Sequence, residues 1–190
     1  MQVCRRGLRS TSAVAMLAAV MDNGTQPLTM HREHVVAAYI DYNGHMNVAF
    51  YVLIFDHATD ALLEHIGHDA AYREATNGSV FVVESHVTYQ SEVHEGDEVS
   101  VTTQVLDGDA KRLRLFHRMW SPAGDLAATN EVMILHVDLA TRRTAPWPDD
   151  QRKRIVDLVE RHKPLGLPPE AGRAITMPLP PARDGASGGA

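Results

Sequence analysis

Residues 41–66 read DYNGHMNVAFYVLIFDHATDALLEHI, a polar turn followed by a long and mostly apolar run. The Asp, Asn and Gly residues in the first seven positions favour a turn. From Asn47 onward the pattern predicts a long helix that ends near Ile66, because Gly67 is a typical stop signal. This helix is the longest element that the sequence predicts, so the other elements must be arranged around it.

The predicted helix changes character along its length. Residues 48–55 are apolar all round, so we expect the start of the helix to be its most deeply buried part. Farther along, an acidic stripe and an apolar stripe lie on opposite faces. The acidic stripe consists of Asp56, Asp60 and Glu64, and the apolar stripe of Tyr51, Phe55, Ala58, Leu62 and Ile66.

Strand-like segments lie on both sides of this helix. Residues 31–41 read as a strand before it, and four alternating segments follow it, with turn residues between them. The spacing of the turns implies consecutive antiparallel strands. A five-stranded sheet needs one face covered, and only the long helix is large enough to cover it, so we expect an α+β fold. The four later segments are residues 79–90, 99–105, 111–120 and 126–138.

The flanking regions are expected to be simpler. Residues 1–28 are expected to form a flexible extension, since the apolar run at 13–21 is far too short to span a membrane. A single domain is expected over residues 29–146, and a short amphipathic helix over residues 147–164. Residues 165–190 are rich in Pro, Gly and Ala, so we expect a disordered tail.

The composition excludes several classes of protein. The chain has 190 residues and a net charge of −6, without the basic stripe that a nucleic-acid-binding protein needs. Its one cysteine, Cys4, can form neither an internal disulfide nor a zinc site with paired cysteines. A reducing compartment fits best, so we expect a cytoplasmic protein that binds neither nucleic acid nor membranes.

Five polar or small residues lie together between the first strand and the long helix: Asp41, Asn43, Gly44, His45 and Asn47. Asp41, Asn43 or Asn47 could each have a purely structural role as the N-cap of the helix. For each residue alone, capping is at least as good an interpretation as catalysis. The five together, followed directly by an apolar run, favour a functional site.

Other combinations of reactive residues give weaker patterns. The chain has eleven histidines, but their spacing shows no metal-binding pattern, so no metal is expected. No G-x-S-x-G motif indicates a nucleophilic serine. Glu84 and His86 share one face of their strand, either as an outward polar pair or as a layer that lines a pocket.

The segment from Asp41 to Asn47, followed by Tyr51, resembles the D-x-x-G-H-x-N motif of hotdog-fold thioesterases of the 4-hydroxybenzoyl-CoA thioesterase type. The order of strands and helix agrees with this family, as does the turn Glu95-Gly96-Asp97 before a strand. The resemblance covers residues 29–143. It implies a hotdog fold, in which a five-stranded antiparallel sheet wraps around one long central helix.

The resemblance also implies a function and a site. It implies hydrolysis of an acyl-CoA, with Asp41 as the nucleophile or as a general base, and a homodimer or homotetramer without a cofactor. A backbone amide of Val48 or of its neighbour Asn47 would hold the thioester oxygen. Alternatives are a non-catalytic module that binds acyl-CoA, and a hydratase of related fold. A basic group has two interpretations: it is a solvated strand face, or it contacts the phosphates of CoA. This group consists of Lys111, Arg112, Arg114 and Arg118, and Arg142 and Arg143 are further candidates for the phosphate contacts.

Within this family, residues 47–60, 79–86, 110–118 and 127–131 resemble the betainyl-CoA thioesterases of carnitine degradation. The resemblance implies a trimethylammonium group in the substrate, with a thioesterase for aromatic or short-chain acyl-CoA as the alternative. Such a cation favours aromatic faces and negative charge. Candidates for the faces are Tyr51, Phe55, Tyr89, Phe116 and Trp120, and Glu84 is the candidate for the charge. The expected substrate-binding residues are Asn43, His45, Tyr51, Glu84 and Trp120.

Overall fold

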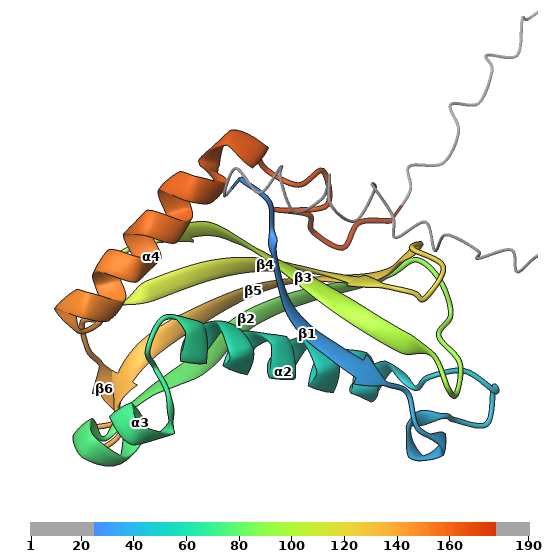
Figure 1. Ribbon diagram of the computed structural model, residues 1–190, viewed down its shortest axis with the longest axis horizontal. Helices are drawn as coiled ribbons and strands as arrows, with labels where there is room; N and C mark the ends of the chain where they lie inside the picture. Colours follow the sequence, from blue (N-terminus) through green and yellow to red (C-terminus); the bar gives the residue numbers. More distant parts are fainter. Residues whose placement is uncertain (1–24, 178–190) are drawn as a thin grey trace, which may run out of the picture.

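The computed structural model describes residues 25–177, so most of the expected extension and the end of the expected tail lie outside the described residues (Figure 1). The elements follow the predicted order of strand, helix, four strands and C-terminal helix, with four short additions: one strand, one helix and two 3-10 turns. The strands are β1 (Leu28–His34), β2 (Gly78–Tyr89), β3 (Glu98–Gly108), β4 (Arg112–Trp120), β5 (Leu126–Asp138) and β6 (Arg143–Thr144). The helices are α2 (Val48–His65), α3 (Ala70–Thr76) and α4 (Asp149–His162), with 3-10 turns η1 (Ala37–Tyr39) and η2 (Lys163–Leu165).

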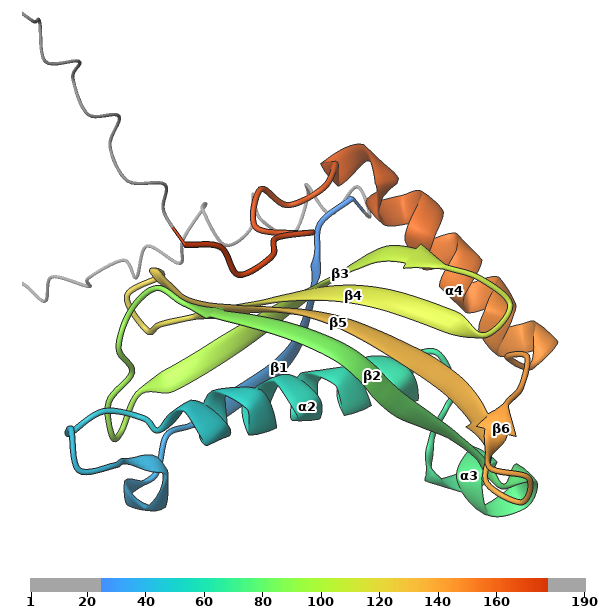
Figure 2. The ribbon, with the colours of Figure 1, turned by 180° about the vertical axis from the view of Figure 1, so that it is seen from behind.

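The strands form one curved antiparallel sheet in the order β1-β3-β4-β5-β2, to which β6 adds a short pairing with β5. Helix α2 lies across the concave side of this sheet (Figures 1 and 2). Helix α4 packs beside β3, where Val105 N donates to His162 Nδ1 at 2.9 Å, and against the end of α2, where Gln151 Nε2 donates to Gly67 O at 3.0 Å. The α+β prediction of a five-stranded sheet wrapped around one helix is confirmed. The expected pairing of consecutive strands is wrong for β2. This strand lies at the edge of the sheet and pairs with β5 rather than with β3.

Helix α2 begins and ends close to the predicted positions. Asn47 is its N-cap, and Gly67 follows its end in the left-handed conformation, with φ of 88°. All five residues of the predicted apolar stripe are buried, at 4% exposure or less. The start of the helix, however, is not its most buried part, since Val48 is 58% exposed and Val52 is 44% exposed. The sheet covers one side of the helix, and within residues 25–177 Val48 and Val52 lie on a face that stays partly exposed.

Two local predictions also need correction. Strand β1 ends at His34 and not at Asp41, because the chain leaves the sheet there and forms η1. Farther along the loop, Ile40 pairs with Met46 in an isolated β-bridge. Residues 70–76, for which the sequence predicted no helix, form α3. Asp69 caps this helix by accepting a hydrogen bond from Tyr72 N at 2.8 Å.

The inner face of the sheet follows the predicted alternation in β3 and β4. Val99, Val101, Thr103 and Val105 are buried in β3, and so are Leu113, Leu115, His117 and Met119 in β4. Strand β2 departs from strict alternation, because a bulge at Val83 shifts its register against β5. Phe81 on one side of the bulge and Val87 and Tyr89 on the other therefore do not belong to one strictly alternating face.

The C-terminal segment is ordered beyond the expected end of structure. After α4 it crosses the outer face of the sheet, where Gln104 Nε2 donates to Gly166 O at 2.8 Å and Arg118 pairs with Glu170 at 3.0 Å. The amide of Gly172 donates to Glu131 Oε2 at 2.5 Å. The expectation of disorder from residue 165 is thus wrong as far as Gly172, because polar side chains on the outer face bind the backbone and acidic groups of this segment.

His117 is a buried link between the sheet and α2. Its Nδ1 lies 2.9 Å from Thr103 Oγ1, and its Nε2 lies 3.1 Å from Thr59 Oγ1. Because the Thr59 hydroxyl donates to Phe55 O at 3.0 Å, the Nε2–H of a neutral His117 is the donor to Thr59. Burial lowers the pKa of His117 to about 3.

We expect this histidine to make folding sensitive to mild acid. The pKa of an unfolded histidine is roughly 6.5, so the unfolded chain takes up the proton first. The contribution of neutral His117 to the free energy of unfolding is therefore fully present above about pH 6.5. It is lost as the pH falls toward the folded pKa, and the free energy of unfolding then falls by about 1.4 kcal/mol per pH unit. Denaturant unfolding of His117→Gln between pH 6 and 5 should show a smaller slope than the wild-type protein. His65→Gln is the matched control, because His65 is exposed on the same helix that His117 contacts. An unchanged slope in His117→Gln would contradict the assignment.

Candidate active site

The loop before α2 is held in a defined shape by its own backbone. Asp41 N donates to His45 O at 3.1 Å, and Gly44 N donates to Asp41 O at 3.0 Å. Gly44 has φ of 83°, a conformation that favours glycine over any residue with a side chain. This tight turn places Asp41 and Asn47 side by side at the start of the helix.

The Asp41 carboxylate is fixed at both of its oxygens. Oδ1 accepts a hydrogen bond from Asn43 N at 2.8 Å, and Oδ2 accepts one from Asn47 Nδ2 at 3.3 Å. The other end of the Asn47 amide caps α2, since its Oδ1 accepts from Ala49 N at 3.0 Å. The Asn47 side chain therefore caps α2, one of the interpretations that the sequence left open, and it also orients Asp41.

The first turn of α2 leaves one amide without an acceptor. The amide of Asn47 donates to Tyr39 O at 2.9 Å, Ala49 N donates to the cap, and Phe50 N donates to Asn47 O at 3.0 Å. Within residues 25–177, no acceptor is present for the amide of Val48. A free N–H at the positive end of a helix can stabilise negative charge, so Val48 fits the role of oxyanion donor better than Asn47.

A pocket of about 350 Å³ opens beside this free amide. It contains three of the predicted site residues, His45, Val48 and Tyr51, and it brings them together with the end of β2 and the loop that follows. The sequence did not identify that loop as part of the site, because its residues form no motif by themselves. The lining residues are His45, Met46, Val48, Tyr51, Tyr89, Gln90, Ser91 and Glu92.

Three predicted substrate-binding residues do not line this pocket. Asn43 lies in the loop, where its amide donates to Asp41, and Glu84 and Trp120 lie on the outer face of the sheet. Glu84 lines a separate outer-face pocket with Arg114 and Glu131, where His86 also lies. Trp120 is on the outer face of β4, and its Nε1 donates to Thr102 Oγ1 at 3.0 Å. Of the other aromatic candidates, Phe55 and Phe116 are core residues with exposures of 0% and 1%. Only Tyr51 and Tyr89 remain beside the pocket at the helix start.

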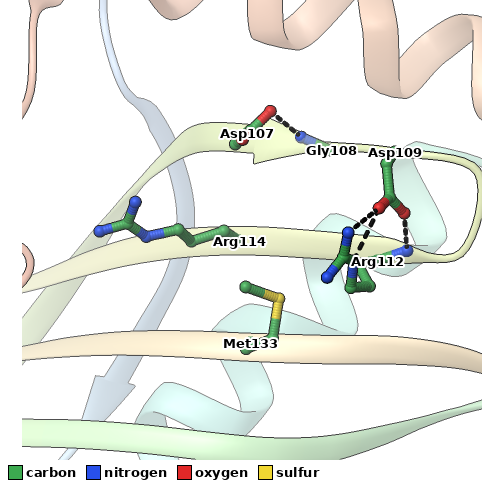
Figure 3. A pocket seen from close by; sticks show the side chains of 6 residues that line it. All are labelled: Asp107, Gly108, Asp109, Arg112, Arg114 and Met133. Atoms are coloured by element: carbon green, nitrogen blue, oxygen red, sulfur yellow. Dashed lines mark hydrogen bonds and ion pairs between the residues drawn. The ribbon is translucent and has the colours of Figure 1, made fainter.

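The basic residues of β4 are mostly neutralised within the chain. Figure 3 shows Arg112 paired with Asp109, at 2.6 Å, beside a small pocket of about 210 Å³ that also contains Arg114 and Met133. Hydrogen bonds from the Lys111 amide and from Arg112 lower the pKa of Asp109 to about 2. Arg114 pairs with Glu131, and Arg118 with Glu170. These pairings favour the structural interpretation of this strand face over a role in binding phosphates.

A polar cluster around Glu33 supports the loop, and no sequence motif indicated it. Glu33 Oε2 lies 2.8 Å from His31 Nε2 and 2.8 Å from His57 Nδ1, while the Tyr39 hydroxyl donates to Oε1 at 2.8 Å. Burial by itself would raise the pKa of Glu33, but the hydrogen bonds from His31, His57 and Tyr39 lower it below its ordinary value. The cluster ties β1 to α2 and to the residue whose carbonyl binds Asn47.

The same cluster bears on metal binding. In the described part of the chain, His31, Glu33 and His57 form the one group of potential ligands that is compact enough for a metal ion. The ligand atoms lie within 4.8 Å of one another, although they come from β1 and from the middle of α2. Spacing along the sequence could not bring His31 and His57 together, because they belong to different elements. Their hydrogen bonds to Glu33 already give each of these side chains a partner.

The sequence and the fold both match known proteins. Over 155 residues the chain is 42% identical to the betainyl-CoA thioesterase of Pseudomonas aeruginosa, covering 81% of this chain and 98% of that protein. It is also 42% identical over 149 residues to the L-carnitine dehydrogenase/betainyl-CoA thioesterase of Agrobacterium fabrum, of which it covers only 30%. A Staphylococcus aureus protein solved in complex with CoA has a TM-score of 0.75 and 32% identity, covering 80% of this chain and 98% of that one.

A second solved structure, from Pseudomonas putida KT2440, has a TM-score of 0.71 and 41% identity, with coverage of 80% and 98%. No helix within residues 25–177 is both long and apolar enough to cross a membrane. The family model described as "Thioesterase-like superfamily" matches residues 35–155, which include the loop of Asp41, the central helix and all the long strands after it. The chain therefore belongs to the thioesterase-like superfamily.

Proposed function

We propose that this protein hydrolyses betainyl-CoA to glycine betaine and CoA, with Asp41 as the catalytic carboxylate. The observation that carries the proposal is a carboxylate that Asn43 and Asn47 hold at the start of α2, close to the free amide of Val48, which lines a pocket. The choice of acyl group is supported by the 42% identity to the Pseudomonas aeruginosa betainyl-CoA thioesterase over nearly its whole length. The binding of CoA is supported by the similar Staphylococcus aureus structure, which was solved with CoA.

The chemistry of a thioester fits these two groups. Attack on the carbonyl carbon places negative charge on its oxygen, and the Val48 amide is positioned to accept that charge at the positive end of α2. The Asp41 carboxylate either attacks the carbonyl carbon itself or removes a proton from an attacking water. In the first route the C–S bond breaks as an anhydride forms between Asp41 and the acyl group, and water then hydrolyses this anhydride. In the second route the water oxygen bonds to the carbonyl carbon and the C–S bond breaks directly. In both routes the sulfur leaves as CoA thiolate and takes up a proton, and the acyl group is released as a carboxylate. Asn43 and Asn47 hold Asp41 in place for either route.

We also propose that the protein works as a homodimer, or as a homotetramer of such dimers, in the cytoplasm. Strand β2 is an edge of the sheet and lies beside α2 (Figure 2). Its Val82 and Val83 are 51% and 55% exposed, and the exposed Val48 and Val52 lie at the start of the neighbouring helix. An unpaired strand edge next to exposed apolar side chains is a favourable surface for pairing with a second copy. The single cysteine is consistent with a reducing compartment.

A panel of acyl-CoA substrates tests the proposed reaction directly. Thiol release should be fastest with betainyl-CoA, compared with butyryl-CoA and 4-hydroxybenzoyl-CoA. Asp41→Asn should lower kcat by about 10²–10⁴-fold, because the variant keeps the shape of the side chain but loses its charge. Asp56→Asn, an exposed substitution on α2, is the control and should leave kcat unchanged. Near wild-type turnover in Asp41→Asn would refute the mechanism, and faster turnover of butyryl-CoA would refute the choice of substrate.

The two roles of Asn47 can be separated. Asn47→Ala should lower the free energy of unfolding by about 1 kcal/mol through loss of the cap, whereas Asn47→Ser should retain most of it because serine also caps helices. Both variants lose the hydrogen bond to Asp41, so both should have a reduced kcat. Urea unfolding and steady-state kinetics on the same preparations measure the two effects. If Asn47→Ser restored full activity, the contact with Asp41 would not matter for the reaction.

The assembly is tested by light scattering coupled to size-exclusion chromatography at micromolar concentration. We expect a mass of two or four chains, because the exposed edge of β2 and the exposed start of α2 would be covered. Val83→Lys should shift the protein toward the monomer, since it places a charge on the proposed interface. A wild-type protein that elutes as a monomer would rule the assembly out.

A further inference from the structure

We propose that Tyr51, Tyr89 and Glu92 form a subsite for the quaternary ammonium group of the substrate. The inference rests on the proposed function, because that group belongs to the acyl part of betainyl-CoA. All three residues line the pocket beside the free amide of Val48. A trimethylammonium cation cannot donate a hydrogen bond, so a protein recognises it through aromatic faces and diffuse negative charge.

The two tyrosines are arranged as the walls of a corner. Their ring centroids are 5.2 Å apart and their planes meet at 83°. Tyr51 is buried in α2, and its hydroxyl donates to Ser91 O at 3.4 Å, which fixes the ring against the loop after β2. Tyr89, at the end of β2, is 48% exposed in the single chain and lines the pocket. A methylated ammonium in this corner lies against both rings, within the roughly 6 Å over which such a cation is attracted.

The distance from the reacting group restricts where the cation can bind. In betainyl-CoA one methylene separates the carbonyl carbon from the nitrogen, so the cation must lie beside the oxyanion donor. Tyr51 follows Val48 by three residues, which places both on the same side of α2 and within one turn of about 5.4 Å. No other aromatic pair lines the pocket.

Glu92 supplies the negative charge on this side of the molecule. Its side chain is 67% exposed, and its nearest basic group is His94 Nε2 at 4.0 Å. Glu92 lines the same pocket as Tyr51 and Tyr89, so its carboxylate lies on the side of the molecule where the cation would bind. Burial raises the pKa of Tyr51, a hydrogen bond with the Val93 backbone lowers it, and the charge of Glu92 raises it. Glu84, on the outer face, lines a different pocket and cannot take this role.

The experiment compares betainyl-CoA with 3,3-dimethylbutyryl-CoA, in which a carbon replaces the charged nitrogen and the shape is kept. The ratio of kcat/KM for the two substrates measures recognition of the charge, and it cancels any loss of active protein. Tyr89→Leu should lower this ratio by about 5- to 30-fold, because it removes an aromatic face. Tyr89→Phe should keep the ratio, since the face remains.

Glu92→Gln should lower the ratio by about 2- to 5-fold, and the loss should shrink at high salt because the charge is exposed. Glu95→Gln is the matched control, since it removes an exposed charge in the same loop that does not line the pocket. Tyr51→Phe removes only the hydroxyl and keeps the buried ring, so it should keep the ratio; a lowered ratio would contradict recognition by the aromatic face.

The outcomes separate this inference from the proposed function. A wild-type ratio near one, with both substrates hydrolysed, would refute betainyl-CoA as the preferred substrate while leaving a thioesterase. A high wild-type ratio that neither Tyr89→Leu nor Glu92→Gln lowers would leave the substrate in place and refute the subsite. A ratio that falls in Tyr89→Leu and Glu92→Gln, but not in Tyr89→Phe or Glu95→Gln, would establish it.

Discussion

The structure depends on the burial of one apolar stripe, that of α2, against the concave side of the sheet. Residues such as Phe55, Ala58 and Leu62 have no exposed surface, so neither the rotation nor the depth of the helix can change without opening the core. At an order of 25 cal/mol per Å² of apolar surface, this burial is a dominant favourable contribution to folding. Because the helix cannot move, its first amides point to a fixed place, and the reactive loop can be built there.

Two polar links make this position specific. His117 connects Thr103 of the sheet to Thr59 of the helix through a buried neutral ring. The Glu33 cluster connects β1 to His57 of the helix and to Tyr39, whose carbonyl oxygen then receives the amide of Asn47. Apolar packing alone would tolerate small shifts of the helix, whereas these hydrogen bonds are satisfied in only one arrangement.

Much of this architecture could be predicted from local patterns. The caps and stripe of α2 and the alternation in β3 and β4 are short-range features, and so is the motif from Asp41 to Asn47. The failures concern contacts between distant segments. The pairing of β2 with β5, the exposed side of α2 and the docked segment at Gly166 all depend on partners far along the chain. For the same reason Glu84 was a reasonable candidate by composition, whereas Glu92 had no motif to distinguish it.

The double role of Asn47 has a consequence for how the protein loses activity under stress. The first turn of a helix is the part most prone to fray, and such local opening needs much less free energy than global unfolding. Here the same side chain holds that turn closed and holds the Asp41 carboxylate. Each fraying event therefore releases the carboxylate while the core stays folded. Inactivation by heat or denaturant is then expected to precede the loss of secondary structure. Activity therefore reports on the local opening of the first turn of α2.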